Sequence, residues 1–266
     1  VGTRRLCGAA DWHLIGGSGS LSDATVSAIG ALLLDESPLS GHPIALTLVR
    51  LGMWLGVAML GGTAAFVGKV KNDELGHTFA RDIRASGVAY STPLAESGAS
   101  TARCYILVTP DGQRTMNTYL GAAQDLSPAD IDPAQIAASS IVYLEGYLWD
   151  PANAKEAFIK ASKIAHENKR SVALTLSDAF CVGRYLTEFQ DLVKNHVDIL
   201  FANEHEITAL WETSDFDAAV KATREHCSLA AITRSAKGSV IVSENQVIEV
   251  PAWPVRQVVD VTGAGD

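Results

Sequence analysis

The sequence ends in Asp260-Val261-Thr262-Gly263-Ala264-Gly265-Asp266, a run whose residue types and spacing suit phosphoryl transfer. Small residues in the Gly-Ala-Gly stretch let successive backbone N–H groups turn toward one point and bind an anion. A helix beginning behind it would add the positive end of its dipole. The final carboxylate could accept a proton from a hydroxyl that attacks phosphorus. The alternative interpretation is a glycine-rich turn capped by an aspartate.

Two further segments carry candidate binding residues. Asn203-Glu204-His205-Glu206 follows an expected strand and opens an expected helix, so it is either an N-cap with acidic residues in the first turn or part of a metal and phosphate site. Thr233 and Gly238 bracket a segment between two expected strands, for which a simple Lys-Gly hairpin turn is the alternative. The sequence contains neither a Walker A loop nor G-x-G-x-x-G, which excludes P-loop kinases and disfavours dinucleotide dehydrogenases.

The elements that must position these residues alternate between strand and helix from Thr63 onward, which favours a mostly parallel sheet with helices on both faces. A turn at Pro110-Asp111-Gly112 between two β-rich runs predicts a hairpin. We expect strands at 64–68, 101–108, 114–120, 141–144, 171–176, 198–201, 229–233, 239–242 and 246–250, and helices at 72–86, 151–168, 185–195, 203–210 and 216–226.

The string D-x-T-G-A-G-D resembles the second signature of the ribokinase-like (PfkB) family of carbohydrate and nucleoside kinases. Asn203 and Glu206 match the family's N-x-x-E motif. Gly68-Lys69-Val70-x-Asn72-Asp73-x-x-Gly76 looks like another family element, although Lys71 replaces a frequent glycine. The resemblance covers about 57–266. It implies a three-layer α/β/α fold with a mostly parallel, Rossmann-like sheet, and a small β lid at the hairpin near 101–120.

The resemblance also implies roles for individual residues, with ATP and Mg²⁺ as cofactors. Asp266 would be the catalytic base, and the backbone N–H groups of Gly263, Ala264 and Gly265 would form the anion hole. Asn203, Glu206, Thr233, Gly238, Asp260 and Thr262 would hold the nucleotide, its phosphates and the metal, with Glu206 organising magnesium. Glu145, at the end of an expected strand, and Arg103 and Asn117 on the hairpin are candidates for contact with the acceptor; solvated or peripheral positions are the alternative for all three.

The acceptor implied by the resemblance is a nucleoside or a sugar. The middle region, with S-T-x-R-C-Y-I-L-V-T-P-D-G and Y-L-E-G-Y-L-W-D, is most similar to the bacterial adenosine kinase-like and sugar kinase branch of the family. We therefore expect ATP-dependent phosphorylation of a hydroxyl group, with adenosine ahead of fructose or ribose. A catalytically inactive fragment is the first alternative. The second is a metal-dependent hydrolase built on Asp260, Glu206 and Asp266, which lacks supporting His or Cys ligands.

Residues 1–56 match the family poorly, and neither its sugar-contacting aspartate nor its G-G-S-x-x-N motif is recognisable there. Back-translated and read one nucleotide earlier, Val49–Gly56 can encode Gly-Ser-Ala-Gly-Asn-Val-Ala-Gly, which resembles that motif. We therefore hypothesise that some or all of the region before Val57 is translated out of frame. In the family a helix and much of the adenine pocket follow the catalytic aspartate, so we also expect the chain to be a truncated form.

The charge and the amino-acid composition limit the classes of molecule that the protein can bind. A formal net charge of −9 disfavours nucleic acid and anionic membranes, and we expect a small-molecule substrate and a monomer or homodimer. The apolar stretch at 44–67 contains Arg50 and four glycines, which disfavours a membrane span. The four cysteines show no metal-ligand spacing, so we expect free thiols in a reducing cytoplasm.

Overall fold

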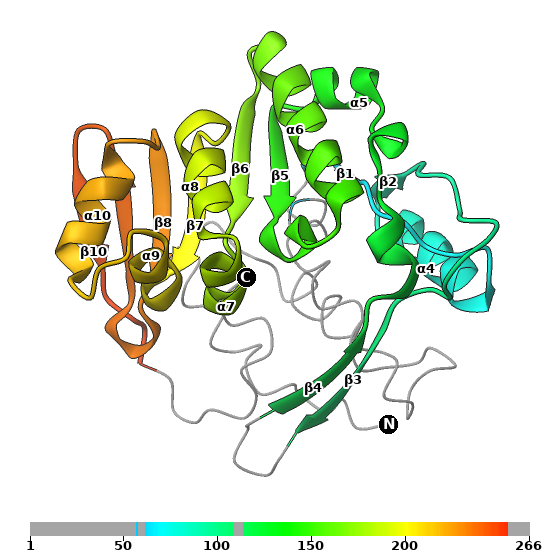
Figure 1. Ribbon diagram of the computed structural model, residues 1–266, viewed down its shortest axis with the longest axis horizontal. Coiled ribbons are helices and arrows are strands. Elements are labelled where there is room, and N and C mark those ends of the chain that lie inside the picture. Colours follow the sequence, from blue (N-terminus) through cyan, green and yellow to red (C-terminus); the bar gives the residue numbers. More distant parts are fainter. Residues whose placement is uncertain (1–56, 58–61, 109–113, 255–266) are drawn as a thin grey trace. The chain divides into compact units, whose positions relative to one another are not determined.

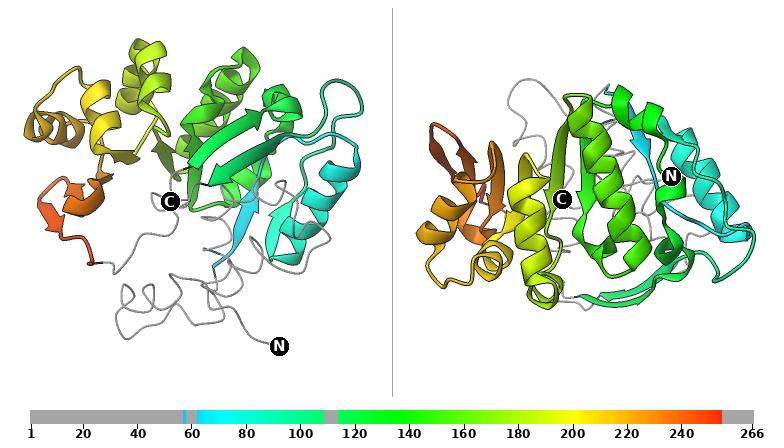
Figure 2. Two further views of the ribbon diagram at one scale, coloured as in Figure 1. Left: turned by 90° about the horizontal axis from the view of Figure 1, so that it is seen from below. Right: turned by 45° about the horizontal axis from the view of Figure 1, so that its top comes forward.

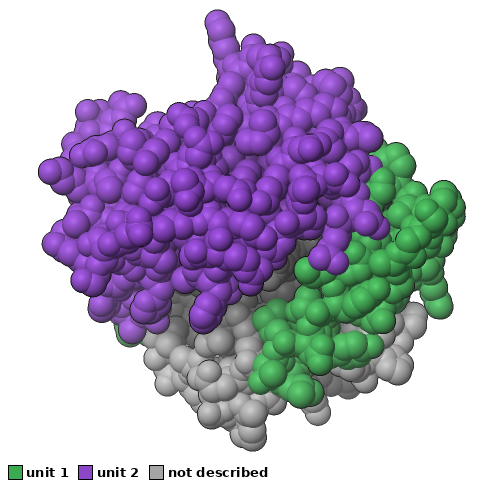
Figure 3. All heavy atoms as spheres, viewed as in Figure 1, with its two compact units in different colours: residues 1–123, 254–266 green, residues 124–253 purple. Residues whose placement is uncertain are grey.

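The computed structural model describes residue 57, residues 62–108 and residues 114–254. The chain divides into two compact units, one of residues 1–123 and 254–266 and the other of residues 124–253 (Figure 3). Each unit is described by itself.

The first unit contains a small parallel sheet backed by one helix. Strand β1 (Ala64–Phe66) pairs with β2 (Val88–Tyr90), and α4 (Glu74–Ala85) connects them (Figure 1). Three aromatic rings meet in its core, with centroids of Phe66, Phe79 and Tyr90 5.5 to 6.0 Å apart. Because these rings and the buried Ile83 come from both strands and the helix, they hold the β-α-β segment together.

The motif that contains Asp73 and Gly76 is explained by contacts at the start of α4. Asp73 is the N-cap, and its Oδ1 accepts hydrogen bonds from the Gly76 N–H at 2.8 Å and the Thr101 hydroxyl at 2.6 Å. Its Oδ2 accepts from the Thr101 N–H at 2.9 Å, so one carboxylate joins the helix to the segment that enters the hairpin. A Cβ on Gly76 would lie 1.9 Å from the carbonyl oxygen of Lys71, which excludes any side chain there.

The hairpin predicted near 101–120 is present. Strands β3 (Arg103–Val108) and β4 (Arg114–Tyr119) are antiparallel, with Arg103 opposite Tyr119 and Tyr105 opposite Asn117. Along β3 the side chains alternate, with Cys104 and Ile106 buried and Tyr105 and Leu107 exposed, whereas along β4 both Met116 and Tyr119 are exposed. The face that carries Tyr105, Leu107 and Tyr119 is therefore open among the described residues.

The second unit is built on a six-stranded sheet in the order β10-β9-β8-β7-β6-β5, in which β5 to β8 are parallel and β9 and β10 are antiparallel additions. The parallel strands alternate with helices along the chain, as expected. The elements following the hairpin are η2 (Gly121–Asp125), η3 (Pro128–Asp130), α5 (Pro133–Ala138), β5 (Ile141–Glu145), η4 (Gly146–Trp149), α6 (Ala152–Glu167), β6 (Ser171–Thr175), α7 (Ala179–Arg184), α8 (Leu186–Asn195), β7 (Ile199–Asn203), α9 (Glu204–Leu210), α10 (Phe216–Arg224), β8 (Leu229–Thr233), η5 (Ser235–Lys237), β9 (Ser239–Ser243) and β10 (Val247–Val250).

The two faces of this sheet are buried to different extents. Helices α6, α8 and α10 lie on one face of the sheet (Figures 1 and 2). The register places Leu144, Leu174, Leu200 and Ile232 on a common face, and all four are buried. On the other face Ile141, Phe201 and Leu229 remain exposed. The alternation along each strand follows the two-residue period of β structure, and the core of the unit lies between the sheet and the helices.

The prediction of a mostly parallel α/β sheet is confirmed, with several local differences. A short helix capped by Ser127 or Asp130 was expected; Ser127 caps η3, and α5 follows it from Pro133, capped by Asp132. The pattern analysis missed β2, and it did not foresee that α7 precedes α8. In the described part of the chain, no helix combines the length and apolar character needed to cross a bilayer. Cys104, Cys181 and Cys227 are buried free thiols, as expected.

Candidate functional site

Several predicted site residues lie at one edge of the sheet of the second unit. Because β5 to β8 are parallel, their carboxyl ends share that edge, where ligands bind in open α/β sheets. Glu145, Asn203 and Thr233 are the last residues of β5, β7 and β8. Asn203 is opposite Thr233 in the β7–β8 register, so the N-x-x-E segment and the predicted nucleotide segment begin side by side.

Asn203 and Glu206 form a reciprocal capping box at the start of α9. The Asn203 side-chain oxygen accepts from the Glu206 N–H at 2.9 Å. In return, Glu206 Oε2 accepts from the Asn203 backbone N–H at 2.9 Å, and its Oε1 accepts from Asn203 Nδ2 at 2.7 Å. The helix N-cap that sequence analysis held as an alternative is therefore present, and it joins the two residues of the motif into one rigid group.

Glu206 is only 7% exposed, which is unusual for a carboxylate. Burial raises the pKa of Glu206 and the negative charge of Asp178 raises it further, while the hydrogen bond from the Asn203 backbone and the nearby His205 act in the opposite direction. Each carboxylate oxygen already accepts one hydrogen bond and retains a second lone pair. A carboxylate of this kind fits a hard cation such as Mg²⁺ approached through a water molecule.

The predicted nucleotide segment forms a tight turn between β8 and β9. The Arg234 N–H donates to the Gly238 carbonyl at 2.7 Å, and Thr233 pairs with Ser239 at the base of the turn. Gly238 has φ +94° and ψ −138°, a conformation available essentially to glycine alone. A Cβ there would also lie 2.0 Å from the Val250 carbonyl oxygen, so the requirement for glycine is explained by the chain's own packing.

Glu145 lies beside the segment that leaves β6. One carboxylate oxygen of Glu145 accepts a hydrogen bond from the Ser177 hydroxyl at 3.3 Å, and Ser177 has a positive φ of 66°. Gly146 follows directly, and a Cβ on it would lie 2.7 Å from the carbonyl oxygens of both Thr175 and Leu176. The close approach of these backbones holds Glu145 at the carboxyl edge of the sheet.

The two hairpin candidates belong to the first unit. Arg103 donates from Nη1 to the Ser100 hydroxyl at 2.9 Å, and its guanidinium carbon lies 4.5 Å from the centre of the Tyr119 ring. Asn117 is exposed on the same face of the hairpin. Both side chains are therefore on the face of the hairpin that carries Tyr105 and Tyr119, in positions suited to contact a ligand or solvent.

The remaining predicted residues, Asp260, Thr262, Gly263, Ala264, Gly265 and Asp266, lie outside the described residues, as does the region 1–56 that matched poorly. Within the described ranges, no three His, Cys, Asp or Glu side chains are grouped so that they could hold a metal ion.

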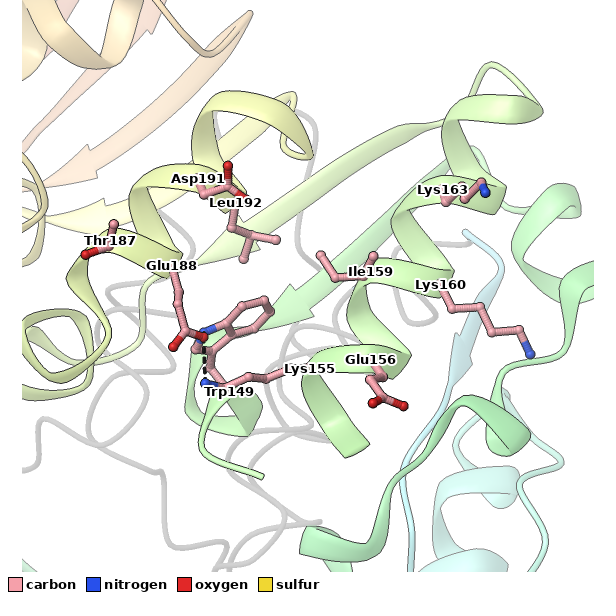
Figure 4. A pocket seen from close by; sticks show the side chains of 10 residues that line it. All are labelled: Trp149, Lys155, Glu156, Ile159, Lys160, Lys163, Thr187, Glu188, Asp191 and Leu192. Carbon is pink, nitrogen blue, oxygen red and sulfur yellow. Dashed lines mark hydrogen bonds and ion pairs between the residues drawn. The ribbon is translucent and has the colours of Figure 1, made fainter. Parts of the chain in front are cut away.

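A surface groove lies elsewhere, between α6 and α8 (Figure 4). Glu188 Oε2 accepts hydrogen bonds there from the Trp149 indole N–H at 2.9 Å and from Lys155 at 2.6 Å. None of the predicted binding residues lines this groove. Trp149, Lys155 and Glu188 therefore join α6, α8 and the turn before α6, and the groove lies apart from the candidate site.

Sequence analysis missed a charged cluster beside the capping box. Glu204, in the first turn of α9, accepts hydrogen bonds from Arg234 Nη2 at 3.1 Å and Lys237 Nζ at 3.2 Å. It also missed Ser177, although polar residues directly after a buried strand are a usable signal for such an edge. The cluster could not be read from the sequence because its partners are 30 and 33 residues apart along the chain.

Comparison with known proteins identifies a family and several relatives that this chain resembles. Residues 52–266 match the family described as pfkB family carbohydrate kinase. The chain is similar to an adenosine kinase from Sinorhizobium meliloti of known structure, with 50% identity and a TM-score of 0.76 over 80% of this chain and 65% of that one. It is also similar to fructokinase-1 of Oryza sativa subsp. japonica, with 28% identity over 219 residues, covering 80% of this chain and 68% of the relative.

A third similarity concerns the fold alone. A candidate ribokinase II from E. coli, in complex with ATP and Mg²⁺, has a TM-score of 0.69 at 20% identity, over 77% of this chain and 67% of that one. The sheet described above is thus a ribokinase-like α/β sheet. The chain spans 65% of the length of the S. meliloti adenosine kinase. On this evidence, the chain belongs to the pfkB family of carbohydrate kinases.

Proposed function

We propose that the protein transfers the γ-phosphoryl group of ATP to a hydroxyl group of a nucleoside or sugar, with adenosine as the first acceptor to test. The observation that carries the proposal is the Asn203–Glu206 capping box, with its buried Glu206, at the carboxyl end of β7, next to the turn that contains Thr233 and Gly238. Family membership supports the reaction type, and the 50% identity to an adenosine kinase supports the acceptor.

In this proposal the chain positions two reactants and receives one proton. The acceptor oxygen bonds to the γ-phosphorus, the bond from that phosphorus to the bridging oxygen breaks, and ADP leaves. Asp266 takes the proton from the acceptor hydroxyl. The backbone N–H groups of Gly263, Ala264 and Gly265 stabilise the negative charge on the transferring group, with Asp260 and Thr262 shaping that loop.

The described residues would bind and orient the substrates. Thr233 and Gly238 would contact the nucleotide, and Glu145, Arg103 and Asn117 would contact the acceptor. Mg²⁺ supplies charge neutralisation at the phosphates when it is bound, and Glu206 is the described residue suited to hold its water ligands. Asn203 keeps Glu206 in place through the hydrogen bonds described above.

The proposal is tested by ADP release from Mg·ATP in the presence of adenosine, ribose or fructose. We expect acceptor-dependent release with at least one of them, and its loss in Asp266→Asn. As a control, Asp191→Asn changes an exposed carboxylate on α8 and should leave the rate unchanged. Absence of ADP release with all three acceptors, or equal release by Asp266→Asn, would contradict the proposal and favour an inactive fragment.

A further inference from the structure

Arg234 connects three elements of the second unit. It lies in the β8–β9 turn, its Nη2 donates to Glu204 at the start of α9, and its guanidinium carbon lies 3.8 Å from the centre of the Phe216 ring at the start of α10. The Arg234 side chain is 20% exposed, and its Nε is buried without a hydrogen-bond partner among the described residues. A partly buried cation that is hydrogen-bonded to a carboxylate depends strongly on that carboxylate.

Glu204 is the anionic partner. It follows the capping residue Asn203 directly, so its backbone position is set by the capping box. Its carboxylate also accepts from Lys237, which is 64% exposed and therefore less constrained than Arg234. The hydrogen bond from Arg234 Nη2 is charge-assisted, so it ties the Glu204 carboxylate to the turn more strongly than a neutral bond would.

The turn held by this cluster contains one residue in a strained conformation. Ser235 has φ +53°, a left-handed conformation that non-glycine residues rarely adopt, whereas Gly238 adopts φ +94° without such a cost. Strain of this kind persists where surrounding contacts determine it. The only described side-chain hydrogen bonds from the turn to another element are those that Arg234 and Lys237 make to Glu204.

We propose that the Glu204–Arg234 pair is a positioning device that sets the β8–β9 turn against the Asn203–Glu206 capping box and thereby determines the affinity for the nucleotide. This inference rests on the proposed function, in which Thr233 and Gly238 contact the nucleotide. Arg234 acts through the turn that it holds and not by reacting. The stacking on Phe216 makes the planar guanidinium the required group, so lysine at this position replaces it only in part.

The test measures the dissociation constant of Mg·ATP by calorimetry and the steady-state constants of the full chain. We expect Arg234→Met and Glu204→Gln each to weaken Mg·ATP binding by about tenfold, and Arg234→Lys to recover part of the loss. The double variant should bind Mg·ATP no more weakly than whichever single variant binds it more weakly, because both changes break the same pair. The KM for ATP should rise, while kcat and the KM for the acceptor should stay within about twofold.

A matched control is Arg184→Met, which breaks the exposed pair between Arg184 and Asp150, 2.9 Å apart, on α7 and the loop before α6. This variant should bind Mg·ATP as the wild type does. If the Arg234 and Glu204 variants lose thermal stability but bind Mg·ATP normally, or if the two changes are additive, the positioning role is wrong. If the wild type itself does not bind Mg·ATP, the proposed function fails, and this inference fails with it.

Discussion

The capping box makes a specific prediction for Asn203→Asp. Aspartate is as good an N-cap as asparagine, so the bond to the Glu206 N–H is kept. The substitution also replaces the donor Asn203 Nδ2, which lies 2.7 Å from Glu206 Oε1, by a carboxylate oxygen. A charge-assisted hydrogen bond thereby becomes a contact between two carboxylates. Because Glu206 is 7% exposed, water screens this contact poorly.

The expected cost follows from the bond that is lost. A hydrogen bond to a charged group contributes about 1.5–3 kcal/mol, and leaving a buried carboxylate beside a second one adds to that, so we expect about 2–4 kcal/mol of destabilisation at pH 7.5. The two carboxylates can recover the bond by taking up one proton. In the folded variant, the pKa of the pair formed by Glu206 and the introduced aspartate is then raised above its unfolded value.

The sign of the pH dependence follows from this shift. A pKa raised in the folded state gives stability that is present below the unfolded pKa and is lost as the pH rises through the folded pKa. The deficit of the variant relative to the wild type should therefore be largest at pH 7.5 and fall below about 1 kcal/mol near pH 4.

Urea denaturation followed by circular dichroism at pH 4, 6 and 7.5 measures this deficit. Asn195→Asp is the matched control, since Asn195 Nδ2 also donates to a carboxylate, that of Asp191 at 2.7 Å, but in an exposed position. There we expect a change of less than about 1 kcal/mol at every pH. A deficit in Asn203→Asp that is equally small, or that does not vary with pH, would refute the assignment of a buried capping box.

Three further results are expected, each from one described contact. Asp73→Asn should lower the stability of the first unit by about 1–2 kcal/mol at pH 7. Burial acts to raise the pKa of Asp73, but the hydrogen bonds from Thr101 and Gly76 outweigh it, so the pKa is lowered. Thermal melts of the variant and the wild type should therefore show the deficit vanish as the pH falls through the lowered pKa. Gly238→Ala should cost more than about 2 kcal/mol, measured by urea denaturation, because its Cβ would collide with the Val250 carbonyl; a neutral effect would contradict the turn geometry. Burial raises the pKa of Cys227 to about 12, so mass spectrometry should find no alkylation by iodoacetamide at pH 8 until the chain is unfolded, and rapid native labelling would show that the thiol is accessible.

Much of the sheet could be predicted because its signals are local. Buried runs such as Val172–Leu174, flanked by helical patterns, specify a parallel strand through hydrophobicity and spacing alone. The hairpin followed from its turn residues in the same way. Strand β2 was missed because three residues, Val88–Tyr90, are too few to show a period, and they form a strand only through pairing with β1.

The candidate site could be predicted only in part. Asn203 and Glu206 have the spacing of a capping box, and the structure brings them together through contacts that span three residues. The Glu204–Arg234 pair depends on the register of β7 and β8, which no short pattern encodes. In the same way, the need for glycine at 238 comes from the approach of Val250, a contact that exists only after the sheet has formed.

The central claim, transfer of phosphate to an acceptor hydroxyl, is tested most directly by ³¹P NMR of the products formed from Mg·ATP and adenosine. The account predicts a new phosphomonoester resonance from the phosphorylated acceptor, rising with that of ADP and absent with Asp266→Asn. ADP accompanied by inorganic phosphate alone would indicate hydrolysis and contradict the account. If adenosine gives no phosphomonoester, fructose and ribose are tested in the same way, and a negative result with all three would contradict the claim of a kinase.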